Sequence, residues 1–97
     1  MVVRVVPLES GRLLVKWSSM EKELPNCVNY EIVVVFDDGS EKRVALVNAE
    51  KKKEYSAIIN VGEEATSLIL QNKLFIKVIA LAPRNIRTNV AEIAVHQ

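Results

Sequence analysis

The sequence predicts an all-β protein, a seven-stranded antiparallel β-sandwich built as a single domain over residues 1–97. Three observations lead to this prediction. Apolar residues recur mainly with a period of two, the spacing of a strand with one buried face. About seven such segments follow one another. Turn residues separate them at regular intervals, a pattern typical of a sandwich. The expected strands cover residues 2–6, 12–17, 30–36, 41–47, 55–61, 74–82 and 90–95.

A proline and a glycine mark the boundary between the first two expected strands. VVRVV is β-branched and stops at Pro7, which suits an edge strand because proline cannot donate a ladder hydrogen bond. Gly11 supplies the turn before RLLVKW. In that segment Leu13, Val15 and Trp17 lie on one face, so this strand is expected to point into the core.

A hairpin joins the third and fourth strands. Asp38-Gly39 is a strong signal for a tight two-residue loop, since both positions tolerate a positive φ. In that register Asp37 pairs with Ser40.

The segment EEATSLILQNK, residues 63–73, has helix formers early and β-branched residues later. It is interpreted as a turn or short helical crossover near 63–72, with TSLIL as a strand being the alternative. LFIKVIALA follows as a strong strand, and PRNIRTN, residues 83–89, is a turn before the last strand.

Three segments resemble a known family. LLVKW resembles the second strand of a fibronectin type III domain, where Trp17 would lie in the core, and YEIVV resembles the third strand. LFIKVIALA resembles the sixth strand, with Leu74 and Ala80 at the ends of its inward register. The likeness covers most of the chain. It implies a sandwich in which the third strand lies beside the sixth, and a binding or spacer module without cofactor rather than an enzyme.

The chain departs from that family in three places. Leu74 replaces the tyrosine of the sixth strand, so the tyrosine corner is missing. The last turn carries Asn85-Ile86-Arg87 without the common glycine, and residues 60–73 are longer than the family needs. The predicted structural core is Leu13, Val15, Trp17, Tyr30, Ile32, Val34, Leu74, Ile76, Val78, Ile93 and Val95.

Composition limits the partners. Thirteen basic and twelve acidic residues give a net charge of +1, which provides no field for nucleic acid or anionic membrane. Lys77 and Asp37 break the longest apolar runs, so no membrane insertion is expected. The single cysteine, Cys27, excludes an internal disulfide, and no glycosylation sequon occurs. Both observations weakly favour an intracellular protein, with an extracellular one as the alternative.

Candidate chemistry is sparse, and neither a metal site nor a cofactor site is predicted. His96 is the penultimate residue, and Cys27 lies in a loop without a base nearby. Asp37 and Asp38 are explained by the turn at Gly39, so no catalytic residues are assigned and the protein is not expected to be an enzyme.

The third and sixth strands carry apolar residues on both faces. In the two-residue register Val33 opposes Val44, Val35 opposes Lys42 and Glu31 opposes Leu46. The outward set is therefore expected to form an apolar patch large enough to bind a partner. That candidate face contains Val33, Val35, Lys42, Val44, Leu46, Phe75, Lys77, Ile79 and Leu81.

Three explanations of this face stay open. The first is that residues 63–73 cover it, or that β-propensity alone favours valine there. The second is that a partner protein or a second copy packs on it. The third is that a strand adds to the edge at 41–47 or 90–95. The resulting prediction is an interaction module of a larger scaffold or adaptor protein that binds through its C′-C-F-G sheet. The alternative is a spacer repeat of an extracellular adhesion or receptor protein.

Overall fold

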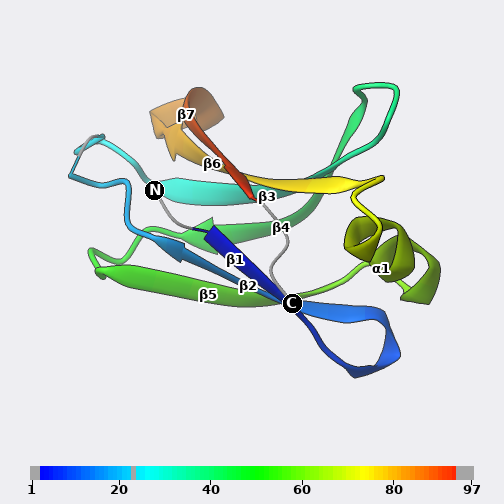
Figure 1. The fold of residues 1–97 in the computed structure, drawn as a ribbon. Helices are drawn as coiled ribbons and strands as arrows, with labels where there is room; N and C mark the ends of the chain where they lie inside the picture. The colour runs from blue at the N-terminus through cyan, green and yellow to red at the C-terminus, as the bar shows by residue number, and fades with distance from the viewer. Residues whose placement is uncertain (1–2, 23, 94–97) are drawn as a thin grey trace.

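The computed structural model describes residues 3–22 and 24–93, and these form two antiparallel sheets with one α-helix (Figure 1). The predicted all-β class is confirmed. The elements are β1 (Val3–Pro7), η1 (Glu9–Gly11), β2 (Arg12–Ser18), β3 (Asn29–Val35), β4 (Glu41–Asn48), β5 (Glu54–Asn60), α1 (Glu63–Leu70), β6 (Phe75–Ala82), η2 (Pro83–Asn85) and β7 (Ile86–Ile93).

The strand order follows from the connections. One sheet has the order β1-β2-β5 and the other the order β4-β3-β6-β7, so β3 lies beside β6 as expected. β1 approaches β7 at one border of the sandwich, and β4 approaches β5 at the other. The inward faces of the two sheets therefore enclose one main core.

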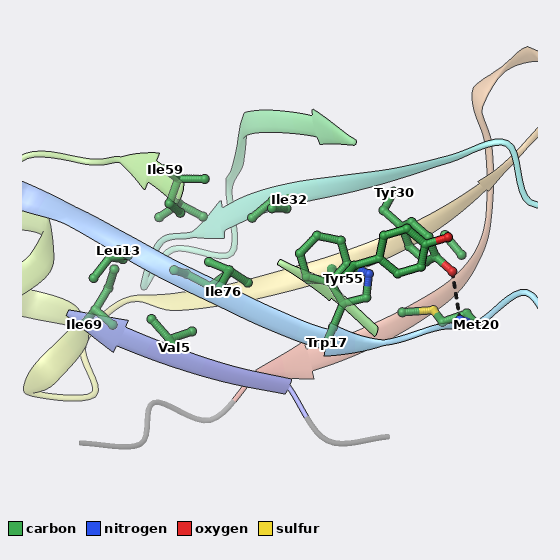
Figure 2. Close-up of a cluster of buried hydrophobic side chains, with 14 of the residues drawn as sticks. Val5, Leu13, Trp17, Met20, Tyr30, Ile32, Tyr55, Ile59, Ile69 and Ile76 are labelled. Carbon is green, nitrogen blue, oxygen red and sulfur yellow. Dashed lines mark hydrogen bonds between the residues drawn. The ribbon is translucent and has the colours of Figure 1, made fainter. Parts of the chain in front are cut away.

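Alternation along the strands builds that core (Figure 2). Nine of the predicted core residues lie buried in it, while the side chain of Ile93 and the whole of Val95 lie outside the described part of the chain. The core also includes seven residues that the sequence argument did not place in it, although Ala80 stood in the inward register. They are Val5, Met20, Cys27, Tyr55, Ile59, Ile69 and Ala80.

Three aromatic rings join the sheets at one end of the core. Trp17 on β2 stacks on Tyr55 on β5, with ring centroids 5.7 Å apart and planes at 12°. Tyr30 comes from the opposite sheet and meets the edge of Trp17 at 5.6 Å and 61°. Such pairs add stability beyond the area they bury.

The β3–β4 hairpin differs from the prediction. The Phe36 N–H donates to Ser40 O, and the Gly39 N–H donates to Phe36 O, so the loop has three residues rather than two. Gly39 takes a φ of 87°, which fits the left-handed residue that ends a three-residue loop. Asp38 is fixed by the Ser40 N–H, which donates to its Oδ1 at 2.8 Å.

The longer loop shifts the pairing by one residue. Val33 opposes Arg43 rather than Val44, and Val35 opposes Glu41 rather than Lys42, so both predicted pairs are wrong. A β-bulge at Val44 then restores the expected pair of Glu31 with Leu46. The additional loop residue therefore places residues 41–43 of β4 on the face opposite to the predicted one, up to the bulge.

Helix α1 is the predicted crossover, so the alternative reading of TSLIL as a strand is wrong. The helix packs against η1 and β2, and its Ile69 enters the main core. Gly11 holds the helix start in place, because its carbonyl accepts the N–H groups of Val61 and Gly62, both at 3.1 Å. The last turn is shorter than predicted, since β7 already begins at Ile86.

We expect Trp17→Ala to lower the free energy of unfolding by about 3–5 kcal/mol, because it removes the largest buried side chain of the core. Denaturant unfolding followed by circular dichroism measures this change. Ile58→Ala is the control, since Ile58 is 60% exposed. Equal losses in the two variants would contradict the central place of Trp17.

Gly11→Ala should destabilise the protein more than Gly39→Ala. Both glycines have positive φ, so both variants carry the same backbone strain. Only at Gly11 would a new Cβ lie 2.5 Å from the carbonyl carbon of Gly62, while nothing lies within 4 Å at Gly39. The expected difference is about 1–3 kcal/mol, measured by thermal unfolding. Equal stabilities would show that η1 and the helix start can separate freely.

Candidate functional site

The candidate face on the four-stranded sheet is largely closed. Val33, Ile79 and Leu81 are buried and form a second apolar cluster with Val35, separate from the main core. Val44, displaced by the bulge, packs against the main core instead of facing outward. The structure therefore does not bring these residues together as one exposed apolar patch.

Of the two lysines predicted for this face, Lys42 differs from its expected place and Lys77 does not. Lys42 pairs with Val34, a residue of the main core, and so belongs to the inward row of the sheet. Lys77 remains in the outward row with Val33, and its Nζ lies 3.6 Å from a carboxylate oxygen of Glu41. Of the apolar residues predicted for this face, only Leu46 and Phe75 are exposed.

An ion pair between buried Glu31 and half-exposed Arg43 lies in the same outward row as Val33. Glu31 is only 2% exposed, and its Oε2 accepts a hydrogen bond from Arg43 Nε at 2.6 Å. Arg43 reaches the outward face because the three-residue loop pairs it with Val33. A buried carboxylate needs such a partner, and removal of one member strongly destabilises a protein. The pairing of Arg43 with Glu31 was not predicted, because only the true hairpin register places Arg43 on the outward face.

A depression lies where the β3–β4 hairpin meets α1. Figure 1 shows the hairpin and the helix at the same end of the sandwich. We call this depression the hairpin–helix groove, with a volume of about 420 Å³. Its lining combines apolar side chains with charged ones. The lining residues are Phe36, Asp37, Val61, Glu64, Ala65, Leu68, Lys73 and Leu74. Phe75 follows Leu74 directly and pairs with Val35 on the outward side.

The two phenylalanines of the chain lie at this same end, and both are exposed. Phe36 is 36% exposed and Phe75 is 47% exposed. Trp17, Tyr30 and Tyr55, the other aromatic residues, are all buried. Aromatic side chains contribute strongly to protein interfaces, so this end of the molecule is the most suitable place for a contact.

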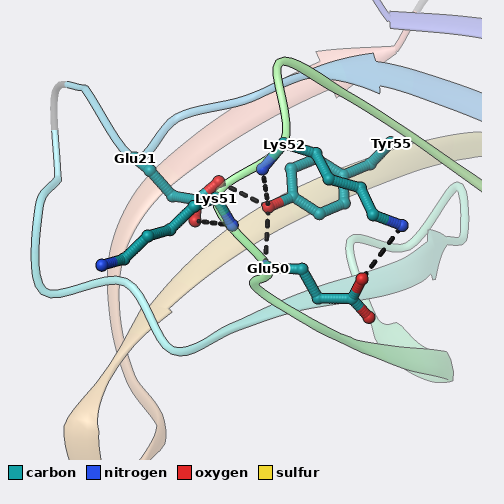
Figure 3. A network of polar contacts seen from close by, with 5 residues as sticks. All are labelled: Glu21, Glu50, Lys51, Lys52 and Tyr55. Atoms are coloured by element: carbon teal, nitrogen blue, oxygen red, sulfur yellow. Dashed lines mark hydrogen bonds and ion pairs between the residues drawn. The ribbon is translucent and has the colours of Figure 1, made fainter.

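A polar network at the opposite end ties two loops together (Figure 3). Glu21 lies in the loop after β2, and its Oε2 accepts the hydroxyl of Tyr55 at 2.5 Å. Its Oε1 accepts the Lys51 N–H at 2.9 Å. The Tyr55 hydroxyl in turn accepts the N–H groups of Glu50 and Lys52. The network thus fixes the loop between β4 and β5 against the loop between β2 and β3.

Burial and hydrogen bonding shift the ionisation of this network. Burial alone raises the pKa of Glu21, but four hydrogen bonds outweigh it and leave the pKa below its usual value. Burial raises the pKa of Tyr30 to about 12. Burial and the bond to the Glu21 carboxylate raise the pKa of Tyr55. The neutral phenols and the charged carboxylate are therefore the forms that the folded protein favours.

We expect neither tyrosine to ionise near pH 10 while the protein is folded. Absorbance at 295 nm should show Tyr30 ionising only as the pH approaches 12 and Tyr55 ionising above its ordinary pKa, whereas both phenols should titrate near 10 in denaturant. Because both pKa values are raised on folding, this contribution to stability is complete below pH 10 and is lost above it. Glu21→Gln should lower the pKa of Tyr55. One phenol ionising normally in the folded wild type would contradict the network.

The remaining candidate residues offer no chemistry in the described part of the chain. Cys27 is buried, burial raises the pKa of its thiol, and its Sγ donates to Asn29 O at 3.2 Å. His96 lies outside the described residues. Among those described, no group of His, Cys, Asp and Glu could hold a metal ion, and no helix has the length and hydropathy to cross a membrane. Comparisons with protein-family models, curated proteins and solved structures find no match to this chain.

Proposed function

We propose that this chain is a non-enzymatic protein-interaction module with a fibronectin type III-like fold. The strand orders β1-β2-β5 and β4-β3-β6-β7 support the fold, since they pair the third strand with the sixth. The contact between Trp17 of β2 and Tyr30 of β3 supports it as well. In this proposal the four-stranded sheet, in the order C′-C-F-G, carries the binding site.

The observation that carries the proposed function is the exposure of both phenylalanines at one end of that sheet. Phe75 lies on the outward row beside Val35, and Phe36 lines the hairpin–helix groove. The two residues therefore lie at the same end of the sheet, Phe75 on its outward row and Phe36 in the groove. A partner that covers both would bury two aromatic side chains, which is the usual composition of an interface centre.

The groove fits an apolar side chain of a partner rather than a polar small molecule. Its lining includes Ala65 and Leu68 on α1 and Leu74 before β6, which are half-buried or buried. The charged lining residues Asp37, Glu64 and Lys73 are exposed. Exposed charges beside apolar side chains are typical of the rim of a protein contact, where they set orientation and specificity. The partner is another protein or a second copy of this chain.

We expect Phe75→Asp to abolish association and to leave the thermal midpoint nearly unchanged, because its side chain is already half exposed. Light scattering over a range of concentrations measures self-association. A crosslinked pull-down with the tagged chain, compared between wild type and variant, measures binding to another protein. Val28→Asp is the matched control, since Val28 is 41% exposed and lies just before β3, at the opposite end of the same sheet.

Two results would overturn this proposal. Equal capture of the same proteins by wild type and Phe75→Asp would remove the phenylalanine end as the binding site. A large drop of the thermal midpoint in Phe75→Asp would show that the ring stabilises the fold rather than a contact. Phe36→Ser provides a second test, since Phe36 reaches the same end from the hairpin.

A further inference from the structure

The outward face of the three-stranded sheet carries a row of apolar side chains that belongs to neither apolar cluster. Val6 on β1 pairs with Leu14 on β2, and Leu14 pairs with Ile58 on β5. The three side chains therefore stand side by side across the sheet. Val6 is exposed, and Ile58 is the most exposed large apolar residue of the described chain at 60%.

Basic residues stand on both sides of this row. Arg12 lies two residues before Leu14 on the same face of β2, and Lys16 lies two residues after it, paired with Arg4 of β1. All three basic residues are exposed. No ion pair joins any of them to a carboxylate within residues 3–22 and 24–93.

A depression lies on the side of the row that carries Arg4 and Lys16. The depression of about 560 Å³ is lined by Arg4 and Lys16 together with Ser18, Glu54, Ser56 and parts of Trp17 and Tyr55. Glu54 pairs with Ser18 at the far end of the face, one row beyond Lys16. Glu9 borders the other end, where its carbonyl accepts the Arg12 Nε–H at 3.3 Å. The centre of the face is thus apolar and its flanks are positive.

We propose that this face binds an acidic segment of a partner protein, in which one apolar side chain lies between two carboxylates. Rows two residues apart along a strand are separated by roughly 7 Å. An extended partner segment with the pattern acidic-x-apolar-x-acidic has the same spacing. Its apolar side chain would cover Leu14 and Ile58, and its carboxylates would meet Arg12 on one side and Lys16 on the other.

Charge excludes a second copy of this chain as the occupant. A two-fold axis through the apolar row would place the Arg12 row of one copy on the Arg4 and Lys16 row of the other. Like charges that face each other across an interface oppose association. The complementary occupant is therefore acidic, and this site is separate from the phenylalanine end of the other sheet.

The test uses the full chain and a fluorescein-labelled peptide in which isoleucine is flanked, two residues away on each side, by glutamate. Fluorescence anisotropy should show binding that weakens as salt is added. Ile58→Ser and Lys16→Glu should each weaken binding about tenfold or more. Phe75→Asp should bind the peptide as the wild type does, which separates this site from the proposed function.

Two matched peptides decide between kinds of ligand. A peptide with serine in place of isoleucine, and one with lysine in place of glutamate, should both bind at least tenfold more weakly. Equal binding of the serine peptide would indicate a site for polyanions of any kind and would overturn the proposal. Absence of binding, or binding unchanged in Ile58→Ser and Lys16→Glu, would overturn it as well. Circular dichroism of each variant confirms that the fold is retained.

Discussion

The contact between Trp17, Tyr30 and Tyr55 is the interaction on which the rest of the molecule depends. The rings come from both sheets, so the contact fixes how the sheets face each other. The two phenols also reach the loops, because Tyr30 accepts the Met20 N–H and Tyr55 donates to Glu21. A single cluster thus joins sheet packing to loop position. The opposite end of the sandwich, where the two phenylalanines are exposed, is left free of this constraint.

The sequence allowed the inward face of most strands to be predicted, because alternation and burial are local properties. Trp17 and Tyr30 were placed correctly for this reason. The inward and outward rows of β3 and β6 were predicted for the same reason, but the pairing across the β3–β4 hairpin was not. The three-residue loop around Gly39 shifts the pairs next to it by one residue, and the bulge at Val44 restores the expected pair of Glu31 with Leu46. The partnership of Glu31 with Arg43 and the apolar row at Leu14 required the true pairing of strands.

The two outward faces of the sandwich differ in how their charged and apolar side chains are arranged. On the four-stranded sheet, paired charges accompany a buried apolar cluster, and Leu46 and Phe75 are exposed on its outward face. On the three-stranded sheet, the apolar row remains in solvent between basic residues that have no ion-pair partner in the described chain. One domain can therefore present two chemically distinct surfaces at once. Such a domain could hold two different proteins on either side of a shared core.

The bulge in β4 has a consequence for how neighbouring domains behave. β4 is an edge of its sheet, with main-chain groups that another strand could pair with. Three consecutive charges, Glu41, Lys42 and Arg43, and the irregular backbone at Val44 interrupt that edge. A strand from an adjacent copy would find neither a regular ladder nor a neutral surface there. Even at high local concentration, as in a tandem array, copies of this chain are then less prone to aggregate by joining their sheets.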